Sequence, residues 1–107
     1  MNPVDLNAKH IDLIDGVLRN AEHPDTFKIP KATDRLRVLP GRIVKIGFEH
    51  RHIKQGPNAE RMWVIVKEQL PDGSYVGELN NDPFFLDLTC GDIIAFEQRH
   101  ILSIYED

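Results

Sequence analysis

Two histidines near the middle of the chain, in His50-Arg51-His52, form the first pattern that can do chemistry. Residues two apart on a β-strand share a face, so both imidazoles can approach one metal ion. A site needs a further ligand, which His23, His100 or a carboxylate would have to supply, and no standard ligand spacing is present. We therefore predict exposed histidines at the end of a strand, and no metal.

The single cysteine, Cys90, can be paired with His100 as a nucleophile and its base. A turn at Gly91 would expose the sulfur, but Asp92 places negative charge beside it and opposes the thiolate. No oxyanion donors are identifiable, and the seven glycines are scattered and form no phosphate-binding loop. We predict that the chain is not an enzyme and carries no cofactor.

The loop sequence Asn80-Asn81-Asp82-Pro83 offers amides and a carboxylate that can bind a ligand. Asparagine and aspartate also initiate turns by bonding their own backbone, and proline fixes the exit from the turn. We predict a turn here and keep a ligand-reading loop as the alternative.

Two aromatic residues, Trp63 and Tyr75, flank the turn Pro71-Asp72-Gly73 and are predicted to be cross-strand neighbours. An aromatic pair of this kind stabilises a core by roughly 0.5–1.5 kcal/mol beyond the area it buries. The alternative is a partly exposed aromatic platform in a groove, suited to peptide binding or base stacking.

The charges are unevenly distributed along the chain, whose net charge is −4. Residues 25–61 carry nine basic and four acidic side chains, whereas residues 62–107 carry two basic and nine acidic ones. The two regions can face each other across a fold, or they can form a polarised surface that selects a partner. The basic middle segment comprises Lys28, Lys31, Arg35, Arg37, Arg42, Lys45, Arg51, Lys54 and Arg61.

These patterns predict an intracellular protein-interaction module without enzymatic activity. The acidic C-terminal half offers a docking face, comprising Glu78, Asp82, Asp87, Asp92 and Glu97, and one form of this hypothesis is an inhibitor- or immunity-like protein that covers a basic site. The alternative is a small-ligand or nucleic-acid binding module that uses the basic middle segment. The candidate binding surface comprises Arg42, Lys45, His50, His52, Trp63, Tyr75, Asn80, Asn81 and Asp82.

The secondary-structure elements that must position these residues are predicted to begin with a helix over residues 1–23. Apolar residues recur there at helical spacing, Asn2 can cap the start, and Pro24 ends the segment. Residues 32–35 are predicted to form a turn. Strands are predicted over 42–50, 62–69, 74–79, 84–88 and 93–96, and residues 100–105 form either a turn of helix or a last strand.

A single α+β domain over residues 1–107 follows from this order of elements. The N-terminal amphipathic helix is expected to pack on residues 25–107, which form a small, strongly bent antiparallel sheet or an SH3-like half-open barrel of five to six strands. No run of about 18 apolar residues is present, so we expect no membrane span. A lone cysteine and the lack of a secretory signal favour the cytoplasm.

The block from Met62-Trp63-Val64 through Gly77-x-Leu79-x-Asn81-Asp82-Pro83 to Gly91-Asp92-x-Ile94-x-Phe96 resembles a bacterial domain-of-unknown-function family, the YegJ-like group. The resemblance covers roughly residues 60–104 and implies a compact β-rich domain with no established activity. The chain departs from the family pattern at its end, where Ile104-Tyr105-Glu106-Asp107 replaces an aspartate–tryptophan pair. The first part of the chain lies outside the match.

Overall fold

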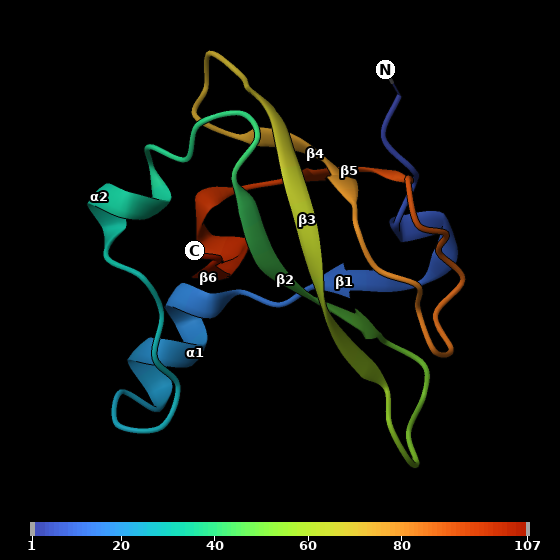
Figure 1. The fold of residues 1–107 in the computed structure, drawn as a ribbon. Coiled ribbons are helices and arrows are strands. Elements are labelled where there is room, and N and C mark those ends of the chain that lie inside the picture. The colour runs from blue at the N-terminus through green and yellow to red at the C-terminus, as the bar shows by residue number, and fades with distance from the viewer. Residues whose placement is uncertain (1, 107) are drawn as a thin grey trace.

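The computed structural model describes residues 2–106, which form an α+β fold with few and short helices (Figure 1). In chain order the elements are the 3-10 helix η1 (Asn7–Lys9), β1 (Ile11–Leu13), α1 (Gly16–Glu22), α2 (Ala32–Arg35), β2 (Ile43–His50), β3 (Ala59–Gln69), β4 (Tyr75–Leu79), β5 (Ile93–Phe96), the 3-10 helix η2 (Gln98–His100) and β6 (Ile101–Ile104).

One strongly curled antiparallel sheet, a half-barrel, forms the body of the molecule (Figure 1). Strands β1 to β5 lie in chain order within it, and β6 pairs with β2. Strand β2 therefore has β3 along one edge, while the other edge is shared by β6 at Val44–Ile46 and β1 at Phe48–His50. Because η2 carries the chain from β5 across to β6, the two ends of the sheet bend toward each other.

The core lies inside the curled sheet and follows the period of two that strands impose. Val44, Ile46 and Phe48 of β2 are fully buried, and so are Val64 and Val66 of β3. These faces are the ones that the alternation in the sequence predicts. The core also contains Ile11, Val38, Met62, Tyr75, Leu79, Leu86, Leu88, Ile94, Phe96 and Ile101.

The hairpin between β3 and β4 is confirmed in both its strands and its turn. Gly73 adopts a φ of 90°, which glycine reaches without the steric cost that other residues bear. Gly77 on β4 has a different reason to be glycine, because a Cβ there would lie 2.5 Å from Val64 Cγ1 and 3.2 Å from a ring carbon of Phe96. The Ile65 carbonyl oxygen would lie at 2.7 Å, so Gly77 chiefly makes room for the close approach of β3.

The predicted helix over residues 1–23 is wrong. His10 takes a left-handed φ of 61°, Ile11 then pairs with His50, and only Gly16–Glu22 is α-helical. Asp15 caps this short helix by accepting a hydrogen bond from the Leu18 N–H at 3.0 Å. Burial of Ile11 in the sheet outweighs the helical period, which is a weak local preference. Helix α1 is accordingly not an amphipathic helix across the sheet.

Three further local predictions need correction or refinement. Residues 84–88 form no strand: Leu86 and Leu88 are buried, but Phe84 is 97% exposed on an irregular loop. The predicted turn at 32–35 is the short helix α2. Of the two alternatives for residues 100–105, the last strand is confirmed as β6, and the turn of helix, η2, comes directly before it. No helix within residues 2–106 is long and apolar enough to cross a membrane.

Candidate binding groove

A hollow of the described surface lies between β6 and the irregular segment before α2. Its volume is about 590 Å³. Leu102, Ser103 and Ile104 of β6 form one wall, and residues 28–31 form the other. The remaining lining residues are Asp34, Arg37, Val38, Arg42 and Glu106.

Two smaller hollows continue this one at its ends. A hollow of about 390 Å³ shares Lys28, Leu102 and Ser103 with it and adds Lys45 and Arg61, together with Thr26 and Phe27. A hollow of about 410 Å³ shares Arg42 and Glu106 with it and adds Gly41, Ile43 and Tyr105. Because the hollows share walls, we treat them as one surface, the basic groove.

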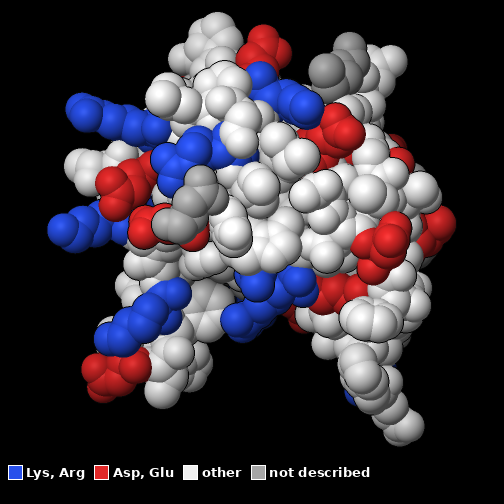
Figure 2. All heavy atoms as spheres, in the orientation of Figure 1, with Lys and Arg blue, Asp and Glu red and all other residues white. Residues whose placement is uncertain are grey.

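The charges of the basic groove are predominantly positive. Six lysine and arginine side chains line it (Lys28, Lys31, Arg37, Arg42, Lys45 and Arg61), against the carboxylates of Asp34 and Glu106. Figure 2 shows blue side chains gathered on the side of the molecule that carries α2, while red side chains dominate the opposite edge. On a chain whose net charge is −4, this is a segregated patch rather than an average surface.

Aromatic rings accompany the cations on the outer face of the sheet. The Nζ atom of Lys45 lies 4.3 Å from the centre of the Trp63 ring, and Tyr105 packs its ring edge-on to Trp63 at 5.6 Å between centres. The guanidinium carbon of Arg61 lies 5.3 Å from the centre of the Phe27 ring. Both cation contacts are within the range in which the ring quadrupole attracts positive charge.

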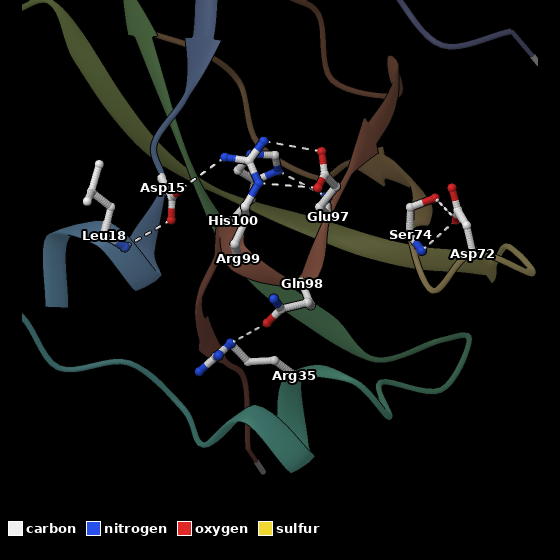
Figure 3. A network of polar contacts seen from close by, with 9 residues as sticks. All are labelled: Asp15, Leu18, Arg35, Asp72, Ser74, Glu97, Gln98, Arg99 and His100. Atoms are coloured by element: carbon white, nitrogen blue, oxygen red, sulfur yellow. Dashed lines mark hydrogen bonds and ion pairs between the residues drawn. The ribbon is translucent and has the colours of Figure 1, made fainter. Parts of the chain in front are cut away.

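A buried arginine fixes the wall of the groove opposite β6. Arg35 is only 7% exposed, and its guanidinium donates to the Pro30 carbonyl and, at 2.8 Å, to Gln98 Oε1 on η2 (Figure 3). The Arg35 carbonyl in turn accepts a hydrogen bond from the Tyr75 hydroxyl at 2.6 Å. Because the same guanidinium binds Pro30 and η2, it fixes the position of the wall relative to the turn that precedes β6.

A second polar network ties η2 to the start of α1 (Figure 3). Arg99 Nη1 donates to Asp15 Oδ2 at 2.9 Å, and Arg99 Nε donates to Glu97 Oε1 at 3.2 Å. Burial of the Asp15 carboxyl favours its neutral form, but the Leu18 N–H and Arg99 outweigh that effect, so the pKa of Asp15 is lowered. The Arg99 hydrogen bonds likewise lower the pKa of Glu97. Both networks meet at η2 and position β6.

Of the predicted surface residues, Arg42, Lys45 and Trp63 lie on the basic groove or directly against its side chains. Tyr75 does not, and the predicted Trp63–Tyr75 pair is wrong. Tyr75 is fully buried and stacks on Phe96 with 5.4 Å between ring centres, whereas Trp63 faces outward. Tyr75 shares the face of β4 that carries Gly77 and Leu79, and these two residues lie opposite Val66 and Val64, so its ring points into the core.

The two candidate histidines lie together at the end of β2, beside a third histidine that the sequence did not place there. His10 joins His50 and His52, with ring centres 4.7 Å apart for His10–His52 and 6.0 Å apart for the other two pairs. The His52 N–H donates to His50 Nδ1 at 3.2 Å. Loss of hydration and the neighbouring positive charges lower the pKa of His52. Within the described chain, no three histidine, cysteine or carboxylate side chains are arranged to hold a metal ion.

The loop at Asn80–Asp82 is a connection fastened to β3. Asn81 Oδ1 accepts a hydrogen bond from the Trp63 N–H at 2.5 Å, and the Asn80 N–H donates to the Trp63 carbonyl at 2.9 Å. Asn80 and Asp82 are exposed. The asparagine contacts therefore go to β3 and not, as predicted, to the loop's own backbone, and the alternative of a ligand-binding loop stays a prediction.

The loop continues into a tight carboxylate contact that sequence reasoning missed. Glu60 of β3 accepts hydrogen bonds from three consecutive backbone N–H groups, at Phe84 (2.7 Å), Phe85 (3.2 Å) and Leu86 (3.0 Å). Burial of the Glu60 carboxyl opposes its charge, but these donors outweigh burial and lower its pKa. A glutamate near a strand end carries no sequence signal for this contact.

The five acidic residues of the predicted docking face are largely engaged within the chain. Glu78 pairs with Lys67 at 3.4 Å, Asp87 with Lys9 at 3.0 Å, and Glu97 with Arg99. Asp92 accepts a hydrogen bond from the Thr89 N–H, and Asp82 is exposed.

The candidate nucleophile and base, Cys90 and His100, lie beyond opposite ends of β5. Cys90 is exposed, while His100 is buried and its Nδ1 accepts a hydrogen bond from the Glu97 N–H.

The groove contains residues that sequence reasoning did not assign to a site, namely Phe27, Tyr105 and β6 itself. Phe27, directly before the basic middle segment, was the available signal, but nothing in the local sequence joins residue 28 to residue 103. No protein-family model matches this chain, and comparisons with curated proteins and with solved structures found no match. The resemblance to the YegJ-like group therefore stays a prediction.

Proposed function

We propose that this chain is a non-enzymatic protein-interaction module that binds an acidic segment of another protein in the basic groove. The observation that supports this most directly is the gathering of six cationic side chains around three connected hollows. Complementary charge steers encounter and selects the partner, while the apolar floor at Val38 and Leu102 supplies contact area.

Two features favour a protein partner over single-stranded nucleic acid. Binding of single strands relies on aromatic faces that are free to stack on bases. Here the Lys45 ammonium lies over the Trp63 ring and the Tyr105 ring packs edge-on against it. The carboxylates of Asp34 and Glu106 also line the groove, where they would repel a nucleic acid that carries a charge at every phosphate, whereas a peptide can place neutral side chains opposite them.

The finer features of this proposal concern architecture and setting. Strand β6 follows a 3-10 turn and pairs with β2, the first long strand, so we propose an SH3-like barrel as the scaffold. We also propose that the protein acts in the reducing cytoplasm, where the exposed Cys90 stays a thiol. The inhibitor- or immunity-like form of the hypothesis, in which acidic side chains cover a basic site, would use a surface other than the basic groove.

A fluorescein-labelled peptide of alternating glutamate and threonine tests this proposal by fluorescence anisotropy. We expect binding that weakens with salt, and at least a roughly tenfold loss of affinity in the Arg42→Glu/Lys45→Glu variant. Lys54→Glu/Lys67→Glu is the matched control, because it also reverses two positive charges and both positions lie outside the groove. Failure of the acidic peptide to bind at low salt would refute the proposal, as would tighter binding of an oligothymidylate of equal charge.

A further inference from the structure

We infer that the acidic segment binds as an added β-strand along the free edge of β6. This inference rests on the proposed function and names the backbone geometry by which the basic groove holds its partner. Strand addition supplies affinity through main-chain hydrogen bonds, and side chains on alternate positions supply specificity.

Strand β6 uses only one of its edges. Within residues 2–106 its only strand partner is β2, with Ile104 opposite Val44 and Ser103 opposite Lys45. The Tyr105 N–H donates to the Ile43 carbonyl at 2.8 Å, so it points toward β2. Backbone groups of successive strand residues point to opposite edges, so the N–H and C=O of Ile104 point away from β2. Ile104 lines the groove, which places this free donor and acceptor at the binding surface.

The opposite wall of the groove leaves this edge uncovered. Residues 28–31 are neither helix nor strand, and no hydrogen bond among the described residues joins them to residues 102–104. The wall is instead fastened from behind: Asn20 Nδ2 donates to the Phe27 carbonyl at 2.8 Å, and the Arg35 guanidinium donates to the Pro30 carbonyl. A segment that enters the groove therefore meets a fixed wall and an unsatisfied strand edge.

The charges around the edge decide which strand can pair with it. Lysine and arginine side chains beside an exposed edge keep it from pairing with a second copy of itself, because like charges would face each other. Such cations lie along the groove at Lys28 and Lys31 on the wall, at Arg42 just before β2 and at Lys45 on β2. An extended segment with glutamate or aspartate at alternate positions turns that repulsion into attraction.

Backbone N-methylation separates strand addition from attraction by charge alone. The alternating glutamate–threonine peptide is compared with the same peptide methylated at every second amide, which keeps all charges and removes the donors of one edge. We expect at least a roughly tenfold loss of affinity in one of the two methylation registers, and little loss in the other. Equal affinities for both methylated peptides and the unmodified one would overturn the inference while leaving the proposed function standing.

Hydrogen exchange of two neighbouring amides gives a readout that does not depend on any variant. Exchange of the Ile104 amide should slow at least roughly tenfold when the peptide saturates the protein, because it gains a hydrogen-bond acceptor. The Tyr105 amide is the internal control, since it is already bonded to the Ile43 carbonyl. Unchanged exchange at Ile104 under saturation would contradict strand addition, whereas absence of any binding would refute the proposed function itself.

A proline variant tests the same hydrogen bond from the side of the protein. Ile104→Pro removes the outward N–H, and proline is tolerated on edge strands where the missing N–H faces solvent. We expect this variant to unfold at nearly the temperature of Ile104→Val but to bind the peptide at least roughly tenfold more weakly. A folded Ile104→Pro protein with the affinity of Ile104→Val would overturn the inference, and the hydrogen-exchange experiment decides it if the variant does not fold.

Discussion

The Nζ atom of Lys45 lies 4.3 Å from the centre of the Trp63 ring, across the ladder that joins β2 to β3. The two residues are direct register partners in this ladder, so the contact is fixed by the backbone and not by a flexible loop. Trp63 is the only tryptophan of the chain, and Lys45 lines the basic groove. The indole is therefore a built-in reporter of what happens at this surface.

Replacing the lysine should change the environment of the tryptophan without disturbing the fold. We expect Lys45→Met to alter the emission spectrum of Trp63 and to lower the free energy of unfolding by about 0.5–1 kcal/mol, as for an exposed cation–π contact. Lys67→Met, on β3 like Trp63, is the control, because Lys67 pairs with Glu78 and its replacement should leave the emission unchanged. Identical spectra for Lys45→Met and the parent protein would show that the contact does not exist in solution.

Loss of the buried guanidinium should loosen the wall of the groove. Arg35→Met leaves the Pro30 carbonyl and Gln98 Oε1 without their donor, and we expect the free energy of unfolding to fall by about 2–3 kcal/mol. Urea denaturation measures this loss. Arg37→Met, at an exposed position two residues away, is the matched control and should change stability by less than about 0.5 kcal/mol. Equal stability of the two variants would argue against the anchoring role of Arg35.

The Glu60 carboxylate should make the loop at residues 84–86 sensitive to acid. Glu60→Gln weakens three hydrogen bonds to backbone N–H groups, so we expect a loss of about 1–2 kcal/mol at pH 7. The folded-state pKa of Glu60 is lowered, so its contribution is present above the usual pKa of 4.5 and is lost as pH falls below it. Thermal unfolding from pH 7 down to pH 3 checks this, because the destabilisation caused by Glu60→Gln should shrink at the acid end. A constant difference would contradict the assignment.

Acidification should also weaken the fold through His100. Burial lowers the pKa of His100 most, and the charge of Arg99 adds to that effect. The unfolded chain therefore takes up the proton first, and stability falls as pH drops through the usual histidine pKa of 6.5. His52, whose pKa is also lowered, acts in the same direction.

The matched variants for this prediction are His100→Asn and His23→Asn. Asparagine at position 100 offers an amide oxygen to the Glu97 N–H but does not titrate, so the decline in melting temperature between pH 7.5 and pH 5.5 should become shallower. His23→Asn removes a histidine at an exposed position and is the control variant. A slope for His100→Asn equal to that of the parent protein would exclude His100 as a source of the pH dependence.

The local sequence was sufficient to predict the hairpin turn and the inward-facing residues of the half-barrel. The turn at Gly73 and the alternation of Val44, Ile46 and Phe48 each depend on neighbouring residues, and both predictions are confirmed. The first part of the chain was predicted wrongly because Ile11 fits a helical stripe and a strand equally well. Its partner His50 is distant in the sequence, and a pairing of that kind leaves no local signal.

The candidate site was predicted in part for the same reason. The basic middle segment, with Arg42 and Lys45, was visible as a charge pattern, and both residues lie on the groove. The wall that completes it, β6, is contributed by the other end of the chain, so sequence alone did not define a groove. Tyr75 was misplaced because alternation along each strand does not show which faces of β3 and β4 meet. Leu79 lies opposite Val64, so Tyr75 points inward, whereas Trp63 points outward.

The most direct test of binding in the basic groove is a map of backbone amide chemical shifts during titration with the glutamate–threonine peptide. We expect the perturbed amides to cluster at residues 28–31, Arg42, Lys45 and 102–105. The Arg42→Glu/Lys45→Glu variant should show no such cluster. Perturbations confined to other surfaces, such as the exposed Phe84 loop, or none at saturating peptide and low salt, would contradict it.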